Sequence, residues 1–133
     1  MNNIFEEYEK EPNTLSLEQM QRIHAKMMDS IGADPDAREL YEAVLNKAII
    51  YANMRAQWEL MDREEKMEKD SLRTSRHDSL ITNLNMLSRF LKIQGKDISW
   101  RDELRYTEND QSLRKTIGDF ACYLVFVNAI CNR

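Results

Sequence analysis

The sequence has few residues that break helices. It contains three glycines and two prolines among 133 residues, and four of these five lie where a helical pattern starts or stops. Breakers this sparse favour an all-α protein. We therefore predict one compact domain over residues 1–133, built as a bundle of four main helices plus one short helix, with an acidic arm at residues 1–13.

The chain also lacks the features of an exported or membrane protein. Its first residues are acidic where a signal peptide carries positive charge, and no apolar segment follows them. The most apolar stretch, Phe120 to Cys131, is well short of the roughly 20 residues that span a bilayer. Cys122 and Cys131 should lie on opposite faces of one helix, too far apart to bridge, so we expect reduced, buried thiols and a cytoplasmic protein.

Motifs for common enzyme chemistry are missing too. The chain has two histidines and no cysteine pair at zinc-ligand spacing. It has no phosphate-binding glycine loop, no nucleophile elbow and no HExxH sequence. The net charge of -4 and the lack of a basic recognition helix give no reason to expect nucleic acid as a partner.

One long stretch, from Asp36 to Gln94, contains neither glycine nor proline. As a single helix it would be about 88 Å long, too long for a compact domain of this size. The apolar stripe fails between Asp62 and Asp78, where several residues could cap a new helix. We therefore predict a long second helix over residues 36–68 and a third helix over residues 75–94.

The remaining helices follow from their caps and apolar spacing. The first should start after Ser16 and end at Gly32, and a short helix should be capped by Ser99. The final helix should start near Asp110 and is almost wholly apolar from Ile117 onward. A helix that is apolar on all sides belongs in the centre of a bundle or in an interface between copies.

A group of polar and aromatic residues falls at the starts of the predicted helices and in their connections. It comprises Arg76, His77, Trp100, Arg101 and Asp119. One interpretation is internal pairing, most simply of Asp119 with Lys115 or with an arginine of the third helix. The other is a pocket for an anion, with Trp100 as one wall.

His77 invites a structural interpretation of its own. It lies one turn before Leu80 and Ile81, which continue into a stripe of leucines, so its side chain should face the core. We expect it in the N-terminal turn of the third helix, where the helix dipole disfavours a cationic imidazole. A polar group of the last helix or of the Trp100 segment should accept or donate its hydrogen bond.

The order of the histidines and aspartates suggests a metal site. His24, the pair His77–Asp78 and Asp119 occur in the order found in the metal-dependent HD phosphohydrolases, which this pattern resembles. The resemblance implies a metal-dependent phosphohydrolase. The residues that flank the pair, "TSR" and "SL", depart from that family's usual aliphatic surroundings.

Two pairs of acids suggest a different enzyme. Glu39 and Glu42 in "ELYE", followed by Glu59 and Asp62 in "ELMD", resemble the motifs of the MazG-type all-α nucleoside triphosphate pyrophosphohydrolases. That resemblance implies magnesium as cofactor, held by acids from two helices. Here both pairs lie on the predicted second helix, with Glu39 and Glu59 about 30 Å apart. They would converge only across a homodimer, or if the helix were kinked near Asn53.

Segments of the C-terminal half resemble a family without assigned chemistry. "RHDSLITNLNMLSRFL", "ISWRDEL" and "RKTIGDFACYLVF" are similar to parts of small uncharacterised helical proteins of bacteria, which implies a helical fold and no particular activity. Our leading hypothesis is a non-enzymatic interaction protein without a cofactor, which binds a second copy of itself or another protein. The apolar surface of the second and final helices motivates it. The alternative is the magnesium-dependent pyrophosphohydrolase.

Overall fold

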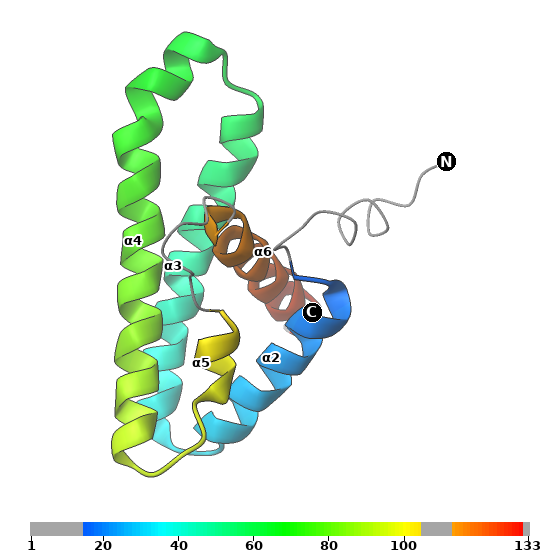
Figure 1. Ribbon diagram of the computed structural model, residues 1–133, viewed down its shortest axis with the longest axis vertical. Coiled ribbons are helices and arrows are strands. Elements are labelled where there is room, and N and C mark those ends of the chain that lie inside the picture. Colours follow the sequence, from blue (N-terminus) through cyan, green and yellow to red (C-terminus); the bar gives the residue numbers. More distant parts are fainter. Residues whose placement is uncertain (1–14, 105–112, 132–133) are drawn as a thin grey trace.

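The computed structural model describes residues 15–104 and 113–131, and only the backbone at 113–115. Within these ranges the chain forms five helices and no strand (Figure 1), which confirms the all-α prediction. The predicted arm at residues 1–13 and the predicted start of the last helix near Asp110 lie outside the described residues.

The first described helix, α2 (Leu17–Ile31), begins and ends as predicted. The Ser16 hydroxyl oxygen accepts a hydrogen bond from the backbone N of Gln19 at 3.1 Å, and the Gln19 side chain accepts one from the backbone N of Ser16 at 2.8 Å. This reciprocal pair satisfies two of the N–H groups that a helix start leaves open. Gly32 follows the helix with a φ of 54°, a left-handed conformation that glycine adopts without strain.

The next two helices, α3 (Pro35–Glu59) and α4 (Arg63–Ile93), form a long antiparallel hairpin (Figure 1). The predicted ranges of 36–68 and 75–94 are therefore wrong at the reversal, which occurs over residues 60–62. The second helix is long, at 25 residues, but α4 is longer, at 31.

Asp62 explains where the reversal occurs. Its carboxylate accepts a hydrogen bond from the backbone N of Glu65 at 2.9 Å and so caps α4. Glu64 and Glu65 then place negative charge in the first turn, where the helix dipole favours it. The charged run after Asp62 thus begins α4 rather than ending α3.

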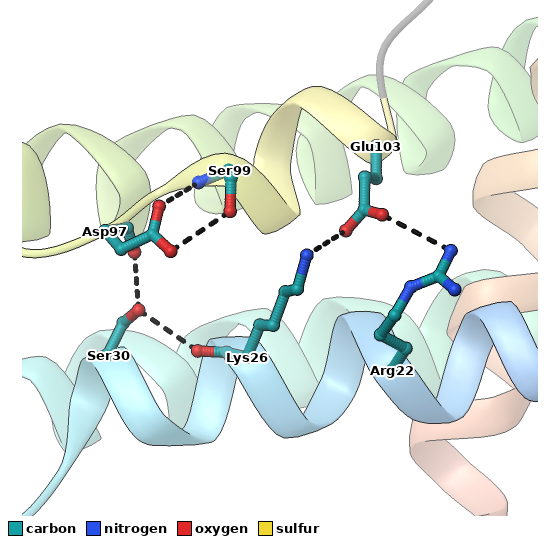
Figure 2. Close-up of polar contacts among 6 residues, drawn as sticks. All are labelled: Arg22, Lys26, Ser30, Asp97, Ser99 and Glu103. Atoms are coloured by element: carbon teal, nitrogen blue, oxygen red, sulfur yellow. Dashed lines mark hydrogen bonds and ion pairs between the residues drawn. The ribbon is translucent and has the colours of Figure 1, made fainter.

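A short helix, α5 (Ser99–Glu103), follows α4 and lies against α2. Figure 2 shows that Asp97, not the predicted Ser99, supplies the side-chain bonds at its start. The Asp97 carboxylate accepts from the backbone N of Ser99 at 2.9 Å and from the Ser99 hydroxyl at 3.1 Å. The residue in the capping position itself, Ile98, makes no side-chain capping bond.

Polar contacts hold α5 on α2. The Glu103 carboxylate lies 3.5 Å from the guanidinium of Arg22 and 3.4 Å from the ammonium of Lys26 (Figure 2). At the other end, the Ser30 hydroxyl donates a hydrogen bond to the backbone oxygen of Asp97. These contacts place Trp100, one residue into α5, fully inside the core.

The core lies between α2, α3, α4 and the first half of the last helix, α6 (Leu113–Cys131). Leu80, Leu84, Leu87 and Leu91 of α4 are each 1% exposed or less, which confirms the predicted leucine stripe. In α6 the buried apolar residues are Ile117, Phe120, Ala121 and Leu124. The first half of α6 therefore lies in the core, whereas several side chains of its second half, including Phe126 and Ile130, are exposed. No helix of the described ranges is both long enough and apolar enough to cross a membrane.

Candidate functional site

His77 lies well inside α4, not in its N-terminal turn as predicted, because α4 begins at Arg63. The argument from the helix dipole for a neutral imidazole therefore does not apply. The side chain is 5% exposed, which confirms its inward direction. Its ring meets the ring of Tyr51 on α3 edge-on, with centroids 5.4 Å apart. Its Nδ1 lies 3.2 Å from the carboxylate of Asp78, and a bond to the last helix or to the Trp100 segment stays a prediction.

Asp119 pairs across helices with Arg55 of α3. The Arg55 Nη1 donates to Asp119 Oδ1 at 2.9 Å, and the two side chains are 29% and 16% exposed. Burial alone would lower the pKa of Arg55, but the hydrogen bond and charge of Asp119 outweigh it and raise that pKa, so the guanidinium stays charged. The sequence pointed to Lys115 or to an arginine of the third helix as the partner and missed Arg55.

Gly118 makes this pairing possible. A Cβ atom at this position would lie 2.5 Å from Arg55 Nη1 and 2.6 Å from Arg55 Cδ. The arginine therefore crosses the α6 backbone where there is no side chain. A glycine inside an otherwise helical pattern is a signal of close approach, and it could have located this contact.

The other members of the predicted polar pocket lie elsewhere. Arg101 donates from Nε to the side-chain oxygen of Asn85 at 3.0 Å, two turns along α4 from His77. Trp100 is 0% exposed, so it is a core residue rather than an open wall. Arg76 is half-buried on α4. A single pocket formed by Arg76, His77, Trp100, Arg101 and Asp119 stays a prediction.

The acids of the two metal-site interpretations do not converge within the chain. Among residues 15–104 and 113–131, no three histidine, cysteine, aspartate or glutamate side chains form a group that could hold a metal ion. Three of the four MazG-like acids, Glu39, Glu42 and Glu59, lie on α3, which is continuous. The fourth, Asp62, caps α4. The HD-like set also fails to assemble; its members are His24, His77, Asp78 and Asp119.

The outward side of α6 presents an apolar surface. Phe126 is 61% exposed and Ile130 is 47% exposed, and Cys122, one turn before Phe126, is also exposed. Residues four apart lie above one another on a helix, so these three form one line, which we name the α6 strip. Its neighbours α2, α3 and α4 cover the other side of the helix.

The prediction that the cysteines are buried is wrong. Cys122 and Cys131 are both free and exposed, because the helices that the structure describes cover α6 on one side only. The elements around Cys122 still desolvate its sulfur enough to raise the pKa of the thiol, against the opposing charge of Arg55. The thiol of Cys122 therefore stays mostly protonated at neutral pH, which makes it a weak nucleophile.

Comparison of the chain with protein-family models, with curated proteins and with solved structures gave no match. The proposals below rest on the geometry of the described residues.

Proposed function

We propose that this chain is a non-enzymatic cytoplasmic protein that associates with a second copy of itself through the α6 strip. The observation that carries the proposal is the exposure of Phe126 and Ile130 on the open side of a helix whose other side is core. Burying such side chains is favourable by about 25 cal/mol for each Å² removed from water. Association would therefore recover free energy that the single copy leaves unused.

The charge pattern favours a second copy as the partner. From Phe120 to Cys131 the sequence contains no charged residue, although the whole chain carries a net charge of -4. Two copies related by a twofold axis bring the same surface of each together, so the surface must be complementary to itself. An uncharged apolar strip meets this requirement, whereas a surface of one charge sign would repel its copy.

The exposed thiols support a reducing compartment. Cys122 and Cys131 are unpaired and accessible, and accessible thiols persist where glutathione and thioredoxin keep them reduced. The cytoplasm provides those conditions.

Sedimentation velocity over a range of concentrations tests the proposal. We expect the wild-type chain to form dimers, and Phe126→Glu to weaken them by at least about tenfold, since a carboxylate buried in an apolar contact lacks a partner. Ile93→Glu is the matched control, because Ile93 is 80% exposed at the end of α4, away from the α6 strip. It should leave the dissociation constant unchanged.

Two results would contradict the proposal. One is a wild-type chain that remains monomeric up to about 100 μM, where even a weak dimer is populated. The other is a Phe126→Glu variant that keeps the wild-type circular dichroism spectrum and dimerises as well as Ile93→Glu does.

A further inference from the structure

The α6 strip is short and has its bulkiest residue at its centre. Cys122, Phe126 and Ile130 follow one another at intervals of four residues, so the strip is about 12 Å long. Phe126 is 61% exposed, more than Ile130 at 47%. A small side chain therefore lies at the N-terminal end of the strip and a large one at its C-terminal end, with the phenyl ring between them.

A twofold axis can bring two such strips together in two orientations. With the axis perpendicular to α6 at Phe126, the two helices are antiparallel, and Cys122 of each copy faces Ile130 of the other. With the axis along α6, the helices are parallel, and each residue faces its own copy. The two Phe126 rings meet in both arrangements. The orientations therefore differ in what the two ends of the strip contact.

The sizes of the end residues favour the antiparallel orientation. Facing positions pack without voids when a large side chain on one helix lies opposite a small one on the other. The antiparallel pair sets each Ile130 over the smaller Cys122, so both ends of the contact have the same thickness. The parallel pair sets Cys122 on Cys122, which leaves a gap, and Ile130 on Ile130, which holds the helices apart.

The polar end of the strip favours the same orientation. Asp119 precedes Cys122 by one turn on the same side of α6. Its side chain is 16% exposed, and its buried Oδ2 atom has no hydrogen-bond partner in the part of the chain that the structure describes. Further loss of water from such a carboxylate is costly. Parallel helices about 8 to 10 Å apart would place the two Asp119 side chains opposite each other, whereas antiparallel helices separate them by about 21 Å along the axis.

The helix dipole adds a third reason. The C-terminal end of a helix carries a partial negative charge, which a basic residue in the last turn offsets. The last turn of α6 contains no basic residue. Parallel pairing would bring two such ends together, and antiparallel pairing places them at opposite ends of the contact.

We infer that two copies pair through antiparallel α6 helices, with both Phe126 side chains at the twofold axis and Ile130 of each copy over Cys122 of the other. This inference rests on the proposed function and adds the orientation and register of the contact. Each α6 strip is then completed by residues of the second copy. Cys122, exposed in the single chain, becomes covered by an apolar side chain on association.

Disulfide trapping with the thiol oxidant diamide tests the register. Every variant carries Cys131→Ser, so that Cys122 is the only native thiol. In Ile130→Cys/Cys131→Ser, the thiols at positions 122 and 130 of the two copies face each other. Two Cys122 residues lie about 12 Å apart along the axis, beyond the roughly 7 Å between Cα atoms that a disulfide spans. The double variant should therefore form linked dimers at least about tenfold faster than Cys131→Ser alone.

Two further variants make the comparison specific. Cys122→Ser/Ile130→Cys/Cys131→Ser has its single thiol at position 130 and should link as slowly as Cys131→Ser. Ala129→Cys/Cys131→Ser keeps every large side chain of the strip, and the antiparallel register brings position 129 within one residue of Cys122 of the other copy, so it should also link fast. Sedimentation under reducing conditions gives the concentration at which each variant is a dimer.

The possible failures are distinguishable. Fast linking of Cys131→Ser alone would assign the parallel orientation and overturn the inference. The inference is also overturned if both two-thiol variants link no faster than their controls while the reduced proteins are dimers. A wild-type chain that stays monomeric in sedimentation overturns the proposed function itself, and the inference with it.

Discussion

Gly118 is a position where the absence of a side chain decides how two helices pack. Glycine in the middle of a helix costs about 1 kcal/mol relative to alanine. In this protein the cost is offset because the Arg55 side chain occupies the space beside the α6 backbone and reaches Asp119. The ion pair is only partly exposed to solvent, so its loss would leave a carboxylate near the core without a partner.

We therefore predict that Gly118→Ala destabilises the protein by about 1 to 2 kcal/mol, the disrupted pair outweighing the gain in helix propensity. In an Arg55→Ala background the obstruction is gone, and the same substitution should stabilise by about 0.5 to 1 kcal/mol. Urea unfolding of the four proteins in this cycle measures both values. A stabilising effect of Gly118→Ala in both backgrounds would show that Arg55 does not occupy this space.

At the scale of elements, the α3–α4 hairpin depends on the cap supplied by Asp62. This residue takes part in no metal group of the described ranges, and its carboxylate bonds to the start of α4. Two contacts between α3 and α4 then align the helices. The rings of Tyr51 and His77 meet edge-on, and the guanidinium of Arg73 lies over the ring of Trp58. The cap and the cross-helix contacts act together, because each requires the reversal to fall over residues 60–62.

Asp62→Ala should lower the free energy of unfolding by about 1 kcal/mol, the usual loss for a helix cap. Asp62→Asn should cost less, because its amide oxygen can still accept from the backbone N of Glu65 while the charge is removed. Chemical denaturation of the three proteins checks this order. Equal losses for alanine and asparagine would mean that charge, rather than the capping bond, accounts for the role of Asp62.

At the scale of the whole molecule, α6 packs mainly on α3, and α2 contacts both α3 and α6. His24 of α2 packs edge-on against Tyr123 of α6, with ring centroids 5.8 Å apart. Burial lowers the pKa of His24 below its usual value. Protonation on the folded protein is therefore harder than on the unfolded chain, so acid weakens the contact between these two helices.

The sign of the resulting pH dependence follows from linkage. Because the pKa of His24 is lower in the folded state, its contribution to stability is complete above the unfolded pKa of about 6.5 and is lost as pH falls through the folded pKa. We predict that the thermal midpoint falls more steeply below pH 6.5 in wild type than in His24→Gln. Differential scanning calorimetry from pH 7.5 to about 5 measures both slopes. Parallel curves for the two proteins would contradict the prediction.

The sequence by itself determined the features that depend on neighbouring residues. The capping box of Ser16, the break at Gly32 and the leucine stripe of α4 are encoded within a few positions, because helix caps and apolar periodicity are local. The same periodicity gave the inward direction of His77. The helical fold class was therefore predictable without the tertiary structure.

Only the tertiary structure decided the features that depend on distant elements. The sequence offered several caps for a new helix, among them Asp70 and Ser71, but α4 is capped by Asp62. The exposure of Cys122 and the pairing of Asp119 with Arg55 were likewise decided by which side of α6 the other helices cover. The physical reason is that burial and ion pairing are set by what lies opposite a residue in space, and the local sequence of a helix does not specify it.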